Sequence, residues 1–322
     1  MILKVIGQIL VAASLVQVFP TDASVFEYQV GEGDFEQTIM SAAELEVAYS
    51  VLPEADSRDY PVKVDLDSYG IVTTAWSAVV IDDSSGAVLF QKHPDALRSI
   101  GSVTKLMAAL VFLEQNPDLS QTVTLDPDLD YVGGGRLYLG YFNGLLLSDV
   151  LAASLVGSDN TATQSLIRFS GLSSADFMAR MNTKADELGM DQTEFYDATG
   201  LDARNMSTAR ELVILLQTAE QNEIIAYYTT QPFITITQAS GRSVTVENTN
   251  TLLTTFMNEY PYSISGGKTG YLPQAGYVLA TTVEYEGDKV HVIVMGAESK
   301  DARVSEAKGL AYWAFKTYQW PE

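Results

Sequence analysis

The sequence predicts an α+β fold in which helices flank an antiparallel sheet and an all-helical subdomain is inserted between the strands. Two runs rich in β-branched residues, 76–82 and 87–91, are separated by a polar turn and predict a β-hairpin. The middle of the chain carries apolar residues at helical spacing, and the last third returns to an alternating pattern before a closing helix at about 301–318. Because strands stand on both sides of the helical block, we expect that block to interrupt a single sheet.

The individual elements follow from local patterns. A helix over 102–114 places Leu106, Leu110 and Leu113 on one face. The sequence Glu286-Gly287-Asp288 predicts a hairpin turn, so the last strands are antiparallel. The other predicted elements are helices at 161–169 and 174–188, a helix that a capping box opens at Thr208 and Glu211, and strands at 233–237, 243–248, 262–268, 277–285 and 290–297.

The chain divides into three expected parts. Residues 1–23 combine a basic residue, an apolar run and a small-x-small site, which predicts a secretory signal peptide, with an uncleaved N-terminal membrane anchor as the alternative. Residues 24–70 are expected to form an acidic spacer, because eleven acidic residues there outnumber two basic ones. Residues 71–322 are expected to form the catalytic domain, with the helical subdomain at about 117–230.

Composition excludes several classes of function. The formal net charge is −22 and the pI is about 4.3, so we expect no nucleic-acid partner, since phosphate binding needs clustered lysines and arginines. The chain has no cysteine and two histidines, His93 and His291, so we expect no metal site and no cofactor. An anionic substrate would have to be held by local cations.

Three short motifs stand in a fixed order and carry the candidate chemistry: Ser102-Val103-Thr104-Lys105, Ser158-Asp159-Asn160 and Lys268-Thr269-Gly270. Ser102 opens its helix, and Lys105 lies one turn along the same face, within reach of the serine oxygen. To act as a base Lys105 must be neutral, and burial and the nearby ammonium of Lys268 would both favour the neutral form.

Each motif taken alone also has a purely structural interpretation. Two further S-x-x-K matches, Ser265 to Lys268 and Ser305 to Lys308, show that this pattern does not by itself identify a nucleophile. The first spans a strand with two glycines, and the second lies inside the closing helix. Likewise, Ser158-Asp159-Asn160 is a common helix-capping sequence. The order of the three motifs therefore carries the prediction.

Taken together, the motifs resemble the active site of the serine penicillin-recognising enzymes. Over about residues 71–320 the chain resembles the low-molecular-mass D-alanyl-D-alanine carboxypeptidases, which implies a β-lactamase/transpeptidase-like fold. Gly101 and Tyr271 depart from residues common at those positions in the family. The stretches that carry the resemblance are Arg98 to Met107, Gly200-Leu201, Ser207-Thr208-Ala209, Asn248-Thr249-Asn250, Gly267 to Tyr271 and Ala275-Gly276-Tyr277.

The resemblance implies a catalytic role for four residues. Ser102 would attack the carbonyl between the two terminal D-alanines of a peptidoglycan stem peptide, with Lys105 as general base, and form an acyl-enzyme. Ser158 would pass a proton to the leaving amine. Asn160 would hold Lys105 and the substrate amide.

It also implies a substrate-binding role for the third motif. Lys268 and Thr269 would bind the terminal carboxylate of the substrate, which supplies the local cation that an acidic protein needs. Gly270 and Tyr271 would also belong to the substrate-binding residues, and the backbone N–H groups of Ser102 and Tyr271 would form an oxyanion hole. The partners implied are the peptidoglycan stem peptide and, as covalent inhibitors, β-lactam antibiotics. The expected location is the periplasm or the outer face of the cytoplasmic membrane.

Three alternatives remain open at this point. A D,D-endopeptidase that cleaves cross-links would use the same residues. A class A β-lactamase would need a glutamate in an E-x-x-x-N pattern, which none of the glutamates between Asn160 and Lys268 has. A non-catalytic wall-binding protein would be expected to have lost the nucleophile or the base, whereas every motif residue is present.

Overall fold

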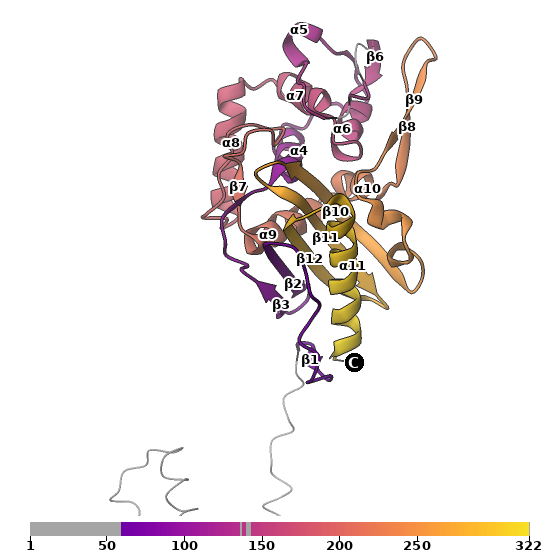
Figure 1. Ribbon diagram of the computed structural model, residues 1–322. Helices are drawn as coiled ribbons and strands as arrows, with labels where there is room; N and C mark the ends of the chain where they lie inside the picture. Colours follow the sequence, from indigo (N-terminus) through magenta and orange to yellow (C-terminus); the bar gives the residue numbers. More distant parts are fainter. Residues whose placement is uncertain (1–58, 136, 140–142, 322) are drawn as a thin grey trace, which may run out of the picture. The chain divides into compact units, whose positions relative to one another are not determined.

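A five-stranded antiparallel sheet lies at the centre of the fold, in the order β10-β11-β12-β2-β3 (Figure 1). The computed structural model describes residues 59–135, 137–139 and 143–321. The early hairpin lies beside the late strands, because β2 pairs with β12 in a register that sets Val80 opposite Val292. The strands are β2 (Ser77–Asp82), β3 (Val88–Lys92), β10 (Tyr262–Leu272), β11 (Gly276–Tyr285) and β12 (Asp288–Ala297).

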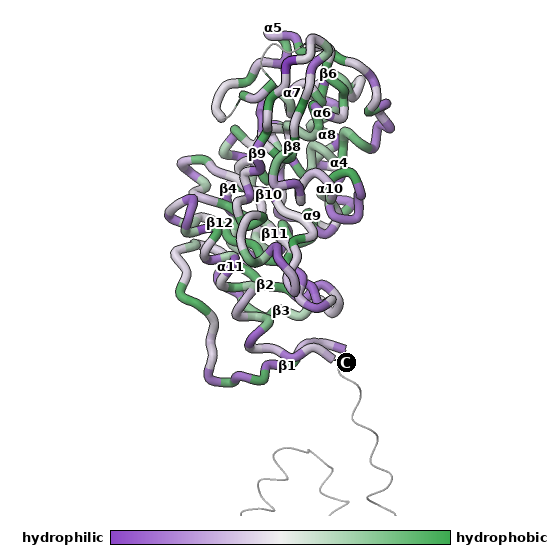
Figure 2. Tube along the Cα trace, turned by 90° about the vertical axis from the view of Figure 1, so that its right-hand side faces the viewer, coloured by the Kyte–Doolittle hydropathy of each residue, from purple (hydrophilic) through white to green (hydrophobic). Residues whose placement is uncertain are grey.

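Two helices pack on the sheet, and strand β2 shows that they lie on opposite faces. Val79 and Ile81 belong to the cluster that contains the inward leucines of α9 (Ala209–Glu220). Ala78 and Val80 belong to a second cluster, which contains the apolar residues of α11 (Lys300–Thr317). This alternation is the two-residue period of a strand buried on both faces. In Figure 2 hydrophobic residues gather in the central strands, and hydrophilic residues are common in the outer turns.

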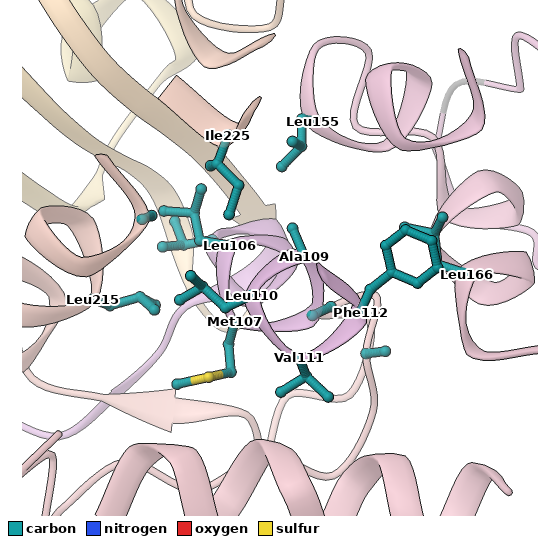
Figure 3. Packing of buried hydrophobic residues seen from close by; sticks show 14 of the residues in the cluster. Leu106, Met107, Ala109, Leu110, Val111, Phe112, Leu155, Leu166, Leu215 and Ile225 are labelled. Carbon is teal, nitrogen blue, oxygen red and sulfur yellow. The ribbon is translucent and has the colours of Figure 1, made fainter. Parts of the chain in front are cut away.

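Helix α4 (Thr104–Glu114) is the central helix of the molecule. Its residues from Thr104 to Phe112 are all buried, although the sequence pattern predicted one apolar face. The reason is that α4 contacts α6, α7, α8 and α9, so several sides of the helix meet neighbouring elements. Figure 3 shows Leu106 and Leu110 on the side of Leu215, whereas Phe112 points toward Leu166.

The inserted block is mainly helical, and its described strands are short: β5 (Thr122–Thr124) pairs with β6 (Asn143–Leu146), and Met206–Ser207 pairs with a strand outside the block. Helix α9 lies within the predicted insertion, 117–230, yet it covers the sheet. Its predicted cap is confirmed, since the Thr208 side chain accepts a hydrogen bond from the Glu211 N–H at 3.1 Å. The helices of the block are α5 (Pro127–Asp130), α6 (Leu147–Leu155), α7 (Asn160–Phe169), α8 (Ser174–Glu187) and α10 (Glu223–Thr230).

Two predicted strands stand apart from the main sheet. β8 (Phe233–Thr237) and β9 (Ser243–Glu247) form a hairpin of their own, which projects beyond α10 in Figure 1. Only Ile236 and Val246 are buried in it, and they are diagonal neighbours, because Ile236 pairs with Val244 and Val246 pairs with Ile234.

The last part of the predicted acidic spacer has defined structure. β1 (Val62–Lys63) pairs with β13 (Tyr318–Gln319), so the segment before the catalytic domain meets the end of the chain. The predicted signal peptide, 1–23, and residues 24–58 of the spacer lie outside the described residues. In the part of the chain that the structure describes, no helix combines the length and apolar character that a membrane span needs.

Candidate active site

Ser102 lies where the central helix begins, in the short 3-10 turn η1 (Gly101–Val103) that leads into α4. Just before the turn, β4 (Arg98–Ser99) pairs with β7 (Met206–Ser207), and the Ile100 N–H donates to the Asn205 carbonyl at 3.1 Å. These backbone bonds fix the turn. Ser102 lines a pocket of about 530 Å³.

The amine of Lys105 is fully buried and lies against three oxygen atoms. Nζ is 3.0 Å from Ser102 Oγ, 2.7 Å from Asn160 Oδ1 and 2.5 Å from the Thr199 carbonyl. Amide and carbonyl oxygens only accept hydrogen bonds, so the two N–H groups of a neutral amine satisfy Asn160 and Thr199. The lone pair then faces the Ser102 hydroxyl, which is the arrangement required of a base that removes its proton.

The charge state of Lys105 fits the same role. Burial lowers the pKa of Lys105 to about 7, although the carboxylates of Asp197 and Asp159 act in the opposite direction. An amine with this pKa is neutral in a large share of molecules at neutral pH.

The motif Ser158-Asp159-Asn160 acts both as a helix cap and as part of the pocket wall. Asp159 is the N-cap of α7, and its carboxylate accepts hydrogen bonds from the Ala162 N–H at 3.0 Å and the Tyr138 N–H at 2.7 Å. Ser158 adopts a φ of +59°, and its Oγ is 2.9 Å from Lys268 Nζ. The cap therefore fixes the backbone of this motif. From it the Ser158 side chain reaches Lys268, and the Asn160 side chain reaches Lys105.

The amide of Asn160 is divided between two partners. Its Oδ1 accepts from Lys105, and its Nδ2 donates to the carbonyls of Gly133 and Gly134. The predicted contact of Asn160 with a substrate amide would therefore require the Gly133-Gly134 loop to shift.

Lys268 projects from β10 and is 1% exposed. Burial lowers the pKa of Lys268 well below its ordinary value, and the charges of Lys105 and Arg303 act in the same direction. A bound carboxylate would oppose these effects. Beside it, Thr269 Oγ1 donates to Thr249 Oγ1 at 2.6 Å.

Two glycines bring β10 and η1 close together. A Cβ at Gly101 would lie 2.8 Å from Tyr271 N, and a Cβ at Gly270 would lie 3.2 Å from Ser102 N. The backbone amides of Ser102 and Tyr271 therefore approach the same region, as the predicted oxyanion hole requires. Tyr271 itself is half exposed and its ring packs on Tyr277, with centroids 4.4 Å apart.

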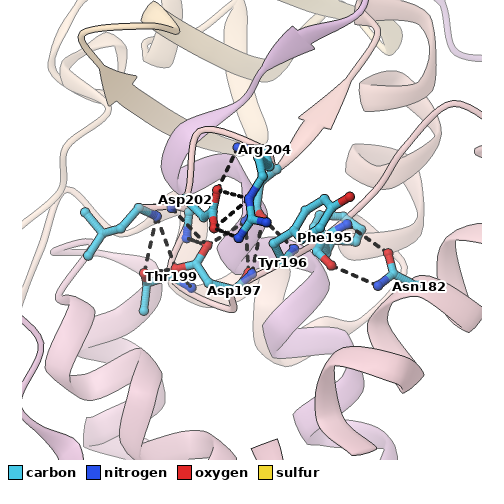
Figure 4. Close-up of polar contacts among 10 residues, drawn as sticks. Asn182, Phe195, Tyr196, Asp197, Thr199, Asp202 and Arg204 are labelled. Atoms are coloured by element: carbon cyan, nitrogen blue, oxygen red, sulfur yellow. Dashed lines mark hydrogen bonds and ion pairs between the residues drawn. The ribbon is translucent and has the colours of Figure 1, made fainter. Parts of the chain in front are cut away.

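Polar contacts hold together the turn from Asp197 to Asn205, of which Figure 4 labels Asp197, Thr199 and Asp202. The Thr199 carbonyl of this turn accepts a hydrogen bond from Lys105. Asn205 also donates to Thr104 Oγ1 at 3.1 Å, which ties this turn to the start of α4. This turn lies outside the three sequence motifs, so its role could not be predicted from them. The donors to the Asp197 carboxylate are the backbone N–H groups of Thr199, Gly200, Leu201 and Asp202, the hydroxyl of Thr199 and the side chain of Asn205.

Arg303, which the sequence analysis also missed, adds a second buried cation near the carboxylate-binding residues. It comes from α11, lines the pocket, and donates to the carbonyls of Gly270 at 3.1 Å and Thr249 at 3.4 Å. Burial lowers the pKa of Arg303 to about 10, and its Nε has no partner among the described residues. Arg303 lies in the closing helix, far along the chain from the three motifs, and no motif points to it.

The structure brings the eight predicted site residues together. Lys105 and Lys268 lie beneath the pocket, in contact with Ser102 and Ser158. Ser265 and Ser305 of the other S-x-x-K matches do not line it. The predicted residues that line it are Ser102, Ser158, Asn160, Thr269, Gly270 and Tyr271. In the described part of the chain, no group of three or more His, Asp or Glu side chains could hold a metal ion.

Comparison with known proteins gives one family match. The sequence model of a family described as D-alanyl-D-alanine carboxypeptidase matches residues 68–299. This range contains all three motifs.

Relatives and a solved structure agree with that match. The D-alanyl-D-alanine endopeptidase of Pseudomonas aeruginosa is 31% identical over 242 residues, which are 74% of this chain and 76% of that protein. The D-alanyl-D-alanine carboxypeptidase DacF of Bacillus subtilis is 26% identical over 250 residues, 76% of this chain and 63% of that protein. The structure of penicillin-binding protein D2 from Listeria monocytogenes in its cefotaxime-bound form has a TM-score of 0.66 and 28% identity, and the match covers 77% of this chain and all of that one.

Proposed function

This chain belongs to the D-alanyl-D-alanine carboxypeptidase family of serine peptidases, and we propose that it removes the terminal D-alanine from peptidoglycan stem peptides. Ser102 Oγ attacks the carbonyl carbon, and Lys105 takes up the serine proton. The C–N bond then breaks, and the leaving amine receives that proton through Ser158. Water next attacks the acyl-enzyme ester, with Lys105 again as base, and restores Ser102.

The observation that carries this proposal is the environment of Lys105. Its amine has two pure acceptors, Asn160 Oδ1 and the Thr199 carbonyl, and one hydroxyl, that of Ser102. Because burial lowers the pKa of Lys105 to about 7, a large share of its amine is uncharged at physiological pH. A lysine with a merely structural role would pair with a carboxylate instead.

The second support is the cation pair at the other end of the pocket. Lys268 and Arg303 are both buried beside Thr269, whereas the whole chain carries a net charge of −22. A buried ammonium and guanidinium favour an anionic ligand, and the free carboxylate of a terminal D-alanine has the matching charge.

Covalent labelling tests the nucleophile. We expect mass spectrometry to find one penicillin adduct on the wild type and none on Ser102→Ala. Ser305→Ala, which changes the serine of another S-x-x-K match, is the matched control and should still be labelled. An adduct that survives in Ser102→Ala would rule out this nucleophile.

The same experiment addresses the β-lactamase alternative. Penicillin-binding protein D2 was solved with cefotaxime bound, which supports β-lactam binding by a protein of this fold. Because the E-x-x-x-N glutamate is missing, we expect the adduct on Ser102 to persist for many minutes. Rapid loss of the adduct with release of hydrolysed penicillin would support a β-lactamase.

An endopeptidase that cleaves peptide cross-links is the second candidate function. It is supported by the relative from Pseudomonas aeruginosa, which is named an endopeptidase and is 31% identical. Both reactions pass through the same acyl-enzyme and differ in the leaving amine. Incubation with a stem pentapeptide and with a cross-linked dimer separates them, because a carboxypeptidase releases D-alanine from the first and leaves the second intact.

We further propose that the protein is exported and acts in the periplasm or on the outer face of the cytoplasmic membrane. The support is the basic residue and apolar run in residues 1–23, together with a substrate that lies outside the cytoplasm. Cell fractionation with N-terminal sequencing of the mature chain tests this proposal. A chain that keeps its first residues and fractionates with the membrane would indicate an uncleaved anchor.

A further inference from the structure

A second cavity, of about 380 Å³, adjoins the active-site pocket at the base of the β8–β9 hairpin. It lies between that hairpin and the 3-10 turn η2 (Thr251–Thr254). The proposed removal of D-alanine does not use it. Its lining residues are Pro232, Phe233, Thr245, Glu247, Asn248, Asn250, Thr251 and Thr254.

The two cavities adjoin and share part of their lining. Glu247, Asn248 and Thr251 line both of them, whereas Ser102 lines only the first. A ligand that is bound at Ser102 and continues past these shared residues would reach the second cavity.

The position of the second cavity shows which part of a substrate would enter it. Its residues Asn248 and Asn250 flank Thr249, and Thr249 contacts both Thr269 and Arg303. Those two residues belong to the end of the pocket where the proposed function places the carboxylate of the leaving group. The second cavity thus lies beyond the leaving group, and not on the side of the acyl group.

The second cavity is built on fixed backbone. Asn248 donates its N–H to the Pro232 carbonyl at 2.8 Å and its side chain to the Gln231 carbonyl at 2.8 Å. The Ala239 N–H near the hairpin tip donates to the Gly144 carbonyl at 3.0 Å. The hairpin is therefore closed at its base and tied to the body of the protein near its tip.

We infer that this second cavity is the subsite for the departing strand of a peptide cross-link, an inference that rests on the acyl-enzyme of the proposed function and on the second candidate function, cleavage of cross-links. Free D-alanine carries only a methyl group beyond its Cα and cannot reach so far. In a cross-link, the amine that leaves belongs to a diamino residue, whose long side chain and flanking peptide continue past its carboxylate. Phe233, 60% exposed, offers an apolar surface for that chain, and the hydroxyl and amide groups of Thr245 and Asn248 suit its peptide groups.

The reaction itself is unchanged by this extension. The bond between the D-alanyl carbonyl and the amine of the departing strand breaks. Ser102 keeps the acyl group until water supplies a hydroxyl to it, and the departing strand leaves with the proton on its amine.

Two substitutions test the subsite without touching the catalytic residues. Thr245→Tyr should fill the cavity, and Phe233→Ala should remove its apolar wall. Both positions lie on an exposed hairpin face, where tyrosine is well tolerated in a strand. Thr237→Tyr, on the same hairpin but outside the cavity, is the matched control.

Each variant is assayed for penicillin labelling, for D-alanine release from a stem pentapeptide and for cleavage of a cross-linked dimer. We expect Thr245→Tyr and Phe233→Ala to lower kcat/KM for the dimer about tenfold or more, and to leave labelling and pentapeptide hydrolysis within about twofold. Thr237→Tyr should change none of the three.

Three results would overturn the inference: equal losses on pentapeptide and dimer, an unchanged dimer rate in both cavity variants, or a wild type that trims the pentapeptide but never cleaves the dimer. A wild type that is neither labelled nor active on any substrate would instead refute the proposed function. The two failures are therefore distinguishable.

Discussion

At Lys105 the burial of one side chain decides whether the site has a base. An exposed lysine has a pKa of about 10.4 and is almost fully protonated at pH 7. Burial lowers the pKa of Lys105 to about 7, and the Asp197 and Asp159 carboxylates limit the shift. The three contacts of its amine then leave the lone pair directed at Ser102.

The acylation rate should therefore follow the deprotonation of Lys105. Since the neutral form is the active one, the second-order rate constant for penicillin labelling should rise with pH and level off above a midpoint near 7. Lys105→Arg should abolish labelling, because a guanidinium keeps its proton. Lys308→Arg, on the outside of α11, serves as the control. A rate that does not change between pH 5 and 9 would show that Lys105 is not the base.

The motifs identified some residues of the site and missed others. Ser102, Lys105 and Lys268 could be predicted because their spacing is local and their chemistry is specific. Asp197 and Arg303 could not, because their roles depend on which segments meet in the folded chain. Asp197 holds a backbone carbonyl, and Arg303 reaches the pocket from the last helix.

At the scale of elements, the contact between β10 and η1 sets the geometry around Ser102. A Cβ at Gly270 would collide with the Ile100 carbonyl and approach Ser102 N at 3.2 Å. Both atoms are backbone and cannot rotate away, so the strand or the turn would have to move.

Gly270→Ala should consequently lower the rate of penicillin labelling by about 100-fold or more, because displaced amides no longer face the developing oxyanion. The melting temperature should change little by comparison. Gly241→Ala, in the β8–β9 turn, is a glycine control outside the site: a Cβ there would meet nothing within 4 Å, and its φ of +87° makes it a control for backbone strain alone. Full-rate labelling of Gly270→Ala would contradict the close approach of β10 to η1.

Asp159 links a helix end to the loop over the pocket. It is fully buried, caps α7 through Ala162, and accepts the N–H groups of Tyr138 and Leu139. Loss of an exposed cap costs about 1 kcal/mol, and each buried donor left without a partner costs about 1–3 kcal/mol more.

Asp159→Ala should therefore destabilise the protein by about 3 kcal/mol, clearly more than Ser173→Ala, which removes the exposed cap of α8. Urea unfolding measures both. Equal losses in the two variants would mean that Asp159 acts as a cap alone.

Across the whole molecule, the order of helices and strands could be predicted from the sequence better than which of them pair or pack together. The hairpin 76–91 and the late strands were recognisable from their alternation, and the structure joins them in one sheet. The separation of β8–β9 from that sheet could not be predicted, because both kinds of strand share the same period of two. The burial of α4 on several sides could not be predicted either, because it depends on the helices that pack around it.

Glu220 connects the helical layer to the sheet through buried polar contacts. From α9 its carboxylate accepts the Thr282 hydroxyl of β11 at 2.5 Å, and Thr282 Oγ1 lies 2.7 Å from His291 Nδ1 on β12. His291 Nε2 in turn lies 2.6 Å from an Asp83 oxygen. Burial raises the pKa of Glu220 to about 7, with the Asp83 charge acting in the same direction and the charge of Lys289 opposing them.

This shift makes stability depend on pH with a definite sign. The folded protein holds the Glu220 proton more tightly than the unfolded chain, so stability is lost as pH rises from about 4.3, the ordinary glutamate pKa, through about 7. The full loss is about 3–4 kcal/mol at 1.36 kcal/mol per pKa unit. Burial lowers the pKa of His291, which gives the opposite trend below about pH 6.5, so the comparison must be with a variant.

Glu220→Gln keeps an oxygen acceptor for Thr282 and removes the titration. Relative to the wild type, its free energy of unfolding should therefore increase by about 2–3 kcal/mol between pH 5 and pH 8. Urea unfolding at several pH values measures this difference, and the shared contribution of His291 cancels. Glu223→Gln, at an exposed position of α10, should show a difference from the wild type that hardly varies over that range. If the difference in free energy of unfolding between Glu220→Gln and the wild type does not vary with pH, the Glu220 carboxylate is ionised in the folded protein at all these pH values. The polar contacts that join α9 to the sheet would then stabilise its charge fully.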